Sequence, residues 1–175
     1  GVAFPKFQSE PGVDLIFANP SLILKNIEDL EAIFITHAHE DHLGAIGFVS
    51  AKLNCKIYCR KFTASIVKDK LDRVQVDHSR VVEVKEWPYE INLKFATISF
   101  FPAVHSVPEA SFLIIKTGVG NILHTGDFKL DKTPVLENPL NLDLLLEALD
   151  GPPALCIADS TNALNHEKGE SENSL

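Results

Sequence analysis

Residues 31–46 read EAIFITHAHEDHLGAI, and this stretch decides both the fold class and the chemistry of the chain. Its first part, Glu31–Thr36, is an apolar, β-branched and aromatic run, typical of a strand buried on both faces in a parallel sheet. From His42 to Leu53 apolar residues recur at helical spacing, and Asp41 can act as the N-cap of that helix. The polar loop between them therefore lies at the carboxyl end of a strand, where α/β proteins place their active sites.

This loop carries three of the seven histidines and one carboxylate within six residues, at His37, His39, Asp41 and His42. His37 and His39 are separated by one residue, so in an extended loop both rings point the same way and can share one ion. Asp41 and His42 can serve a second ion, as in hydrolytic centres whose two metals lie about 3.5–4 Å apart. The alternative is an exposed polar loop with coincidental histidines. The strand, loop and helix context favours the metal site.

Strands and helices alternate outward from this loop. Residues 56–59 predict a second strand and residues 61–71 a second helix, and this βαβα order indicates an α/β layer. The following half changes to a meander, with strands predicted at 81–84, 91–100, 111–117 and 121–124. A helix at 141–149 and a buried strand at 152–158 complete the chain. The pattern predicts an α/β fold in which a mixed sheet is covered by helices.

Two more strand ends carry residues that can complete a metal site. His105 follows the 91–100 strand region, and Asp127 follows the 121–124 strand after Gly126, which allows a sharp turn. A third histidine would give one ion its protein ligands, and a carboxylate such as Asp127 can bridge two ions. Each residue also has an ordinary alternative, since a histidine can be a core residue and an aspartate a turn cap. Together with the first cluster they favour a metal site.

Composition limits the class of protein. A chain of 175 residues with 45% hydrophobic and 23% charged residues suits one globular domain. No apolar run approaches the roughly 18 residues of a membrane span, so no membrane partner is expected. Cys55, Cys59 and Cys156 have no framework spacing and are expected to be free core thiols in a reducing cytoplasm. The net charge of −8 argues against a general electrostatic grip on nucleic acid, so any such binding must be local.

Other residues that could bind a ligand have a structural interpretation. His124 is expected to pack between strands and His78 to be solvated in a charged loop. Cys55 and Cys59 have Cys-x3-Cys spacing but lack a second pair, which disfavours a zinc knuckle. The segment 87–89 (Trp-Pro-Tyr) could stack on a base, but a turn with an aromatic plug is more common.

The motif HAHEDH at 37–42 resembles the His-x-His-x-Asp-His signature of the metallo-β-lactamase superfamily. Four ordered blocks, 34–46, 104–108, 123–129 and 158–162, resemble more specifically the bacterial ribonuclease J family of the β-CASP branch. This resemblance implies an αββα sandwich that is incomplete here. Residues 1–165 would form a partial metallo-β-lactamase domain whose first strands are missing. Residues 166–175 would begin the β-CASP insertion or form a disordered tail, so the chain is expected to be a piece of a longer protein.

The resemblance also implies roles for the candidate ligands. The first Zn²⁺ is expected to bind His37, His39 and His105. The second is expected to bind Asp41 and His42, and Asp127 is expected to bridge the two ions. Two zinc ions are therefore expected in the full-length protein, with Mn²⁺ as the alternative. One further histidine for the second ion has no match in the chain, and His166 in the polar tail is a poor candidate.

Asp41 and Asp159 are the residues expected to take part in catalysis. DSTN at 159–162 resembles the segment with which the β-CASP motifs begin. Its aspartate would orient a histidine that protonates the leaving oxygen, and the alternative is that Asp159 caps its own turn.

The function implied is hydrolysis of RNA by a metal-dependent ribonuclease in the cytoplasm, with any self-association made through regions outside this chain. Another hydrolase of the same superfamily, acting on a thioester, a lactone or a different phosphodiester, is the first alternative, and the segment 159–162 favours the nuclease. A non-catalytic scaffold in RNA processing is the second. The presence of all ligands expected from this stretch argues against it.

Overall fold

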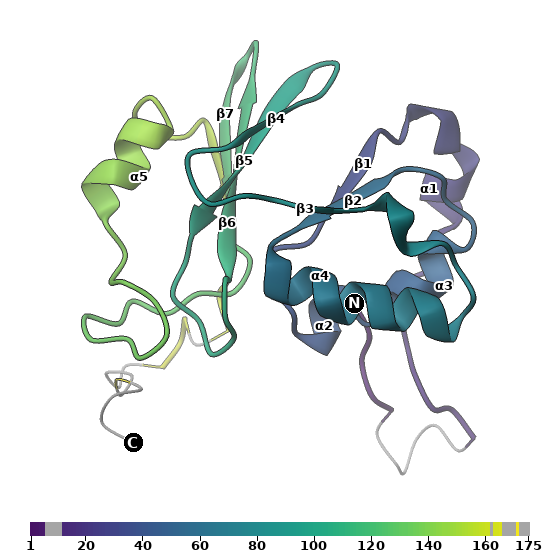
Figure 1. The fold of residues 1–175 in the computed structure, drawn as a ribbon. Coiled ribbons are helices and arrows are strands. Elements are labelled where there is room, and N and C mark those ends of the chain that lie inside the picture. Colours follow the sequence, from purple (N-terminus) through teal and green to yellow (C-terminus); the bar gives the residue numbers. More distant parts are fainter. Residues whose placement is uncertain (6–11, 162, 166–170, 172–175) are drawn as a thin grey trace. The chain divides into compact units, whose positions relative to one another are not determined.

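The computed structural model describes residues 1–5, 12–161, 163–165 and 171, which form two compact units, Gly1–Val84 and Lys85–Leu175 (Figure 1). Nearly all of the segment 166–175, including His166, lies outside the described residues, so the predictions made for it stay predictions. The residue pattern predicted one mixed sheet, whereas the structure has two sheets, one in each unit.

The first unit is built on a three-stranded parallel sheet in the order β1-β2-β3. Its strands are β1 (Ala32–Phe34), β2 (Lys56–Cys59) and β3 (Val81–Glu83). Its helices are α1 (Ser21–Lys25), α2 (Glu40–Leu43), α3 (Ile46–Ser50) and α4 (Lys61–Arg73), with 3-10 turns η1 (Ile27–Asp29) and η2 (His78–Arg80). The predicted strand, helix, strand, helix order is therefore present.

The core of this unit lies between the sheet and α4. Ala64, Val67 and Leu71 are fully buried and recur at helical spacing along one face of α4. They belong to one apolar cluster with Ile57 and Cys59 of β2. Because all of the strands run parallel, their carboxyl ends share one edge of the sheet, and the loop that follows β1 starts there.

The helix predicted from His42 to Leu53 is instead two short helices, α2 and α3. The break falls at Gly44, where an added Cβ would lie 2.5 Å from a side-chain atom of Val2, so only glycine fits this packing. The prediction that Asp41 caps the helix was also wrong. His39 keeps an extended backbone and is the N-cap residue, which places Asp41 inside the first turn.

The second unit is a five-stranded sheet in the order β4-β5-β6-β7-β8, antiparallel from β4 to β7 and parallel between β7 and β8. Its strands are β4 (Glu90–Asn92), β5 (Ala96–Pro102), β6 (Ser111–Thr117), β7 (Gly120–His124) and β8 (Leu155–Ile157). Helix α5 (Leu142–Ala148) lies beside this sheet (Figure 1). Leu145 of α5 packs in one apolar cluster with Phe112 and Ile114 of β6.

Two predictions for this unit need correction. The single strand predicted at 91–100 is the pair β4 and β5, because the chain turns at 93–95 and Phe95 is exposed. The strand predicted at 152–158 is not buried. All residues of β8 are exposed at the edge of the sheet, so Cys156 is an exposed thiol, whereas Cys55 and Cys59 are buried as expected.

The longest described helix, α4, has 13 residues, and within the described part of the chain no helix combines the length and apolar character needed to cross a bilayer.

Candidate metal centre

In the first unit, the loop after β1 gathers four potential ligands, His37, His39, Asp41 and His42, which we call the His37 half-site. The backbone continues the β1 pairing as far as Ile35, whose N–H donates to the Tyr58 carbonyl at 3.0 Å. His37 is completely buried, and its Nδ1 lies 2.9 Å from the Thr36 hydroxyl. A hydrogen bond of this kind holds the imidazole ring in a fixed orientation.

The rings of this half-site are close together. The His37 ring centroid lies 5.0 Å from that of His39, with the rings nearly perpendicular, and 4.1 Å from that of His42. A ligand atom of His37 lies within 4.8 Å of one of His39, and the same holds for Asp41 and His42. His42 Nε2 is 3.6 Å from Asp41 Oδ2. The two pairs that sequence spacing suggested are therefore each close enough to share an ion.

The His37 half-site is tied to α4 by an ion pair that sequence reasoning missed. Glu40 stands between two candidate ligands, and its carboxylate oxygens lie 2.7 and 2.9 Å from Lys70 Nζ. The two residues are 30 positions apart, and each belongs to a different helix. No local pattern could have indicated this contact.

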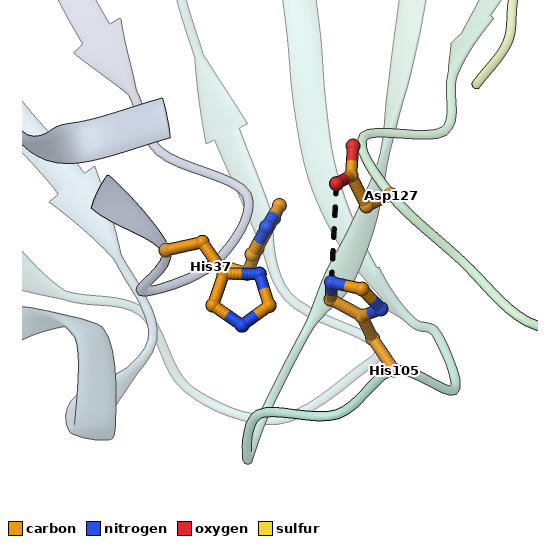
Figure 2. A group of neighbouring side chains, drawn as sticks. His37, His105 and Asp127 are labelled. Atoms are coloured by element: carbon orange, nitrogen blue, oxygen red, sulfur yellow. Dashed lines mark ion pairs between the residues drawn. The ribbon is translucent and has the colours of Figure 1, made fainter. Parts of the chain in front are cut away.

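In the second unit, strand ends bring together His105, Asp127 and Asp159, which we call the Asp127 half-site. His105 Nε2 lies 3.9 Å from Asp127 Oδ2, and Figure 2 shows this ion pair as a dashed line, with His37 of the first unit also drawn. Gly126 has a φ of +53°, the sharp turn that was predicted before Asp127. The Lys129 N–H donates to the Val104 carbonyl at 2.8 Å and joins the two ligand loops.

Asp159 follows β8 and caps its own turn. Its Oδ1 accepts hydrogen bonds from the N–H of Thr161 at 2.8 Å and from the Thr161 hydroxyl at 2.6 Å. These bonds, with the Thr161 hydroxyl as the largest cause, lower the pKa of Asp159 below its ordinary value, and the nearby charge of His105 lowers it further. Asp159 therefore does cap its turn, and its role in orienting a histidine stays a prediction.

Within the described residues, two further histidines, His78 and His124, lie outside both half-sites. Nδ1 of His124 accepts a hydrogen bond from the Gly126 N–H at 3.0 Å, as expected of a structural histidine. His78 is exposed, but it lies in η2 rather than in a loop, with Nδ1 2.6 Å from Asp72 Oδ1. The ring of Trp87 packs 5.3 Å from that of Phe101, which confirms the aromatic plug.

The chemistry of the donors fits zinc. Histidine nitrogens and aspartate oxygens are common Zn²⁺ ligands, and both half-sites present only these two kinds. Carboxylate and imidazole ligands also suit manganese, so ligand type alone does not select between the two metals.

Comparison with known proteins identifies relatives of the chain. The model of the family described as "Beta-lactamase superfamily domain" matches residues 8–150. Ribonuclease J 1 of Streptococcus pyogenes is 35% identical over 164 residues, which cover 93% of this chain and 29% of that protein. Ribonuclease J of Mycobacterium tuberculosis is 36% identical over 176 residues, which cover 100% of this chain and 31% of that protein. The chain therefore spans less than a third of the length of these relatives.

A solved structure also matches part of the chain. The metallo-beta-lactamase fold protein YhfI from Bacillus subtilis is 19% identical, covers 58% of this chain and 42% of its own, and has a TM-score of 0.43. The family match over residues 8–150, which is most of the chain, assigns the family. On that match, the chain belongs to the beta-lactamase superfamily and has its metallo-β-lactamase fold.

Proposed function

We propose that this chain supplies the metal-binding part of a nuclease that hydrolyses RNA phosphodiester bonds. The observation that carries the proposal is that each unit presents histidine and aspartate side chains on loops that follow its strands, in pairs whose ligand atoms lie within 4.8 Å. Relatives named ribonuclease J match along 93% or more of the chain and so support RNA as the substrate.

The proposed ligand assignment follows the two half-sites. His37, His39 and His105 would hold the first ion, and Asp41 and His42 the second. Asp127 would bridge them. We propose zinc as the ion, with manganese as the alternative. Two such ions supply a nucleophile at neutral pH and stabilise negative charge on the scissile phosphate.

The side chains of the proposed centre set its net charge, and Asp159 would orient its proton donor. The histidines bind as neutral ligands, and only the carboxylates of Asp41 and Asp127 offset the charge of two divalent ions. With two divalent ions bound, the centre would keep a positive charge and would attract a phosphodiester locally, despite the net charge of −8 on the chain. The Asp159 carboxylate is ionised at neutral pH, as any aspartate of ordinary or lowered pKa is, and this is the form that can hold a proton-donating histidine in place.

The test uses the full-length gene product with end-labelled RNA. Cleavage should stop after chelation and return with Zn²⁺ or Mn²⁺. The double variant His37→Ala with His39→Ala should lose bound metal and cleavage together. His78→Ala is the matched control, because His78 lies outside the half-site. Unchanged metal content or unchanged cleavage in the double variant would refute the proposal.

A substrate panel tests the choice of RNA. Thioester, lactone and cyclic phosphodiester substrates should be hydrolysed far more slowly than RNA by the metal-loaded protein. Faster turnover of any of them would assign the centre to another hydrolase of the superfamily.

We also propose a cytoplasmic location, because all of the cysteines, Cys55, Cys59 and Cys156, are free thiols, which suits a reducing compartment. Thiol labelling of the protein in its native compartment should find all of the cysteines reduced.

A further inference from the structure

Thr125 follows β7 and joins two loops of the Asp127 half-site through a single side chain. Its hydroxyl accepts a hydrogen bond from the Asp159 N–H at 2.9 Å and donates one to the Gly126 carbonyl at 2.7 Å. Its backbone N–H donates to the Ile157 carbonyl at 2.9 Å. The residue is only 4% exposed, so water competes little for these bonds.

The position of Thr125 at the end of β7 explains why a side-chain hydroxyl is needed to bind the Asp159 N–H. The parallel pairing of β7 with β8 ends at His124 and Ile157, and the Thr125 N–H extends it by one bond. The N–H of Asp159 lies beyond the end of this ladder and is bound by the threonine hydroxyl instead of by a strand carbonyl. The other partner of the hydroxyl, Gly126, directly precedes Asp127.

We propose that Thr125 is a positioning residue of the nuclease centre, whose hydroxyl holds the Asp159 turn beside the loop that presents Asp127. This inference rests on the proposed function, because it assigns the two carboxylates to that centre. Valine has the shape of threonine but lacks the hydroxyl, and serine retains the hydroxyl. The two substitutions therefore separate hydrogen bonding from packing.

The first experiment measures RNA cleavage by the full-length gene product. Thr125→Val should lower kcat about 10-fold or more at an unchanged KM for RNA, in the range found for groups that orient metal-site residues. Thr125→Ser should stay close to wild type. Thr63→Val is the matched control, since Thr63 is equally buried and its hydroxyl makes no hydrogen bond within the described residues. An unchanged kcat in Thr125→Val would overturn the proposal.

A second experiment reads the position of the turn without using activity. Hydrogen exchange, followed by mass spectrometry in peptides that overlap at Asp159, should show an amide about 10-fold or more faster in Thr125→Val and unchanged in Thr125→Ser. Unchanged exchange in Thr125→Val would overturn the proposal even if kcat fell. Faster exchange with unchanged kcat would reduce Thr125 to a structural residue and overturn it too.

A third comparison asks whether Thr125 acts through Asp159. In an Asp159→Asn background, Thr125→Val should lower kcat less than about 2-fold further, because the group being positioned has already lost its charge. Independent, multiplying losses would contradict the proposal. If the valine variant does not fold, Thr125→Ala removes the same hydroxyl and gives the same readouts. Failure of the wild-type protein to cleave RNA would refute the proposed function, while the exchange rates would still test the contact.

Discussion

Substitution of Asp159 by asparagine tests whether its carboxylate orients a proton donor or only caps a turn. The asparagine Oδ1 can accept both hydrogen bonds from Thr161, so the cap should survive and the melting temperature should change little. The negative charge is lost, however. If that charge holds a histidine in place, RNA cleavage should fall on the order of 10²-fold, the range found for general acid catalysis.

Alanine at the same position separates the two roles. Asp159→Ala removes both bonds from Thr161, and a hydrogen bond of this kind contributes about 0.5–1.5 kcal/mol to stability. For a protein of this size, that corresponds to roughly 2–4 °C in melting temperature per kcal/mol. The orienting role therefore predicts that both variants lose activity and that only alanine lowers the melting temperature by several degrees.

A second aspartate provides the control. Asp77 caps η2 in a similar way, with Oδ1 accepting from the Ser79 N–H at 2.8 Å, but it lies outside both half-sites. Asp77→Ala should lower the melting temperature and leave cleavage unchanged. The assays are single-turnover cleavage of RNA, metal content by mass spectrometry, and thermal unfolding. Full activity in Asp159→Asn, together with a lower melting temperature in Asp159→Ala, would show that Asp159 is only a cap.

Three further predictions concern a turn, an ion pair and a hydrogen bond in the half-sites. Gly126→Ala should destabilise the protein by about 1–2 kcal/mol in denaturant unfolding, because alanine is strained at a φ of +53°, and an unchanged midpoint would contradict this. Lys70→Glu should weaken zinc binding a few-fold in competition with a chelating dye, and adding Glu40→Lys should recover part of it, since a half-exposed pair is worth about 0.2–1 kcal/mol. No recovery would mean that the pair does not hold the loop. Thr161→Val should raise the pKa of Asp159 in a nuclear magnetic resonance titration. Because the folded pKa is lowered, the bond stabilises the protein above about pH 4 and is lost as the pH falls through the folded value, so the difference in stability between wild type and variant should vanish in acid.

The parts of the structure that sequence predicted well depend on neighbouring residues. Strands β2 and β6 begin and end where the apolar runs indicated, because a short apolar, β-branched run bounded by polar and turn residues is a local property of the sequence. The closeness of the four candidate ligands in the His37 half-site likewise follows from their lying within six residues of one another, and their binding of metal stays a prediction. The turn at Gly126 also followed from its own residue type.

The parts that sequence missed depend on contacts between distant residues. The need for glycine at position 44, beside the break, comes from the approach of the Val2 side chain, which helical periodicity does not contain. The Lys70–Glu40 pair spans 30 residues, and the Thr125–Asp159 bond spans 34. The exposure of β8 also could not be read from its apolar composition, because an apolar run indicates a strand but not which elements cover it.

The contacts around the candidate ligands determine how metal binding relates to folding. In each half-site a polar group that is not a ligand holds the loop: the Thr36 hydroxyl contacts His37, and the Thr125 hydroxyl binds the Asp159 N–H. These are bonds between parts of the protein, and both threonines are buried. The loss of conformational entropy that comes with ordering the donors within each half-site therefore occurs when the chain folds. Little of this entropic cost is left to weaken the binding of the ion. This differs from a zinc finger, in which metal binding itself supplies the free energy of folding. On this reasoning, substitution of a ligand should remove metal and activity without unfolding the unit that carries it, whereas substitution of a holding threonine should impair both order and activity.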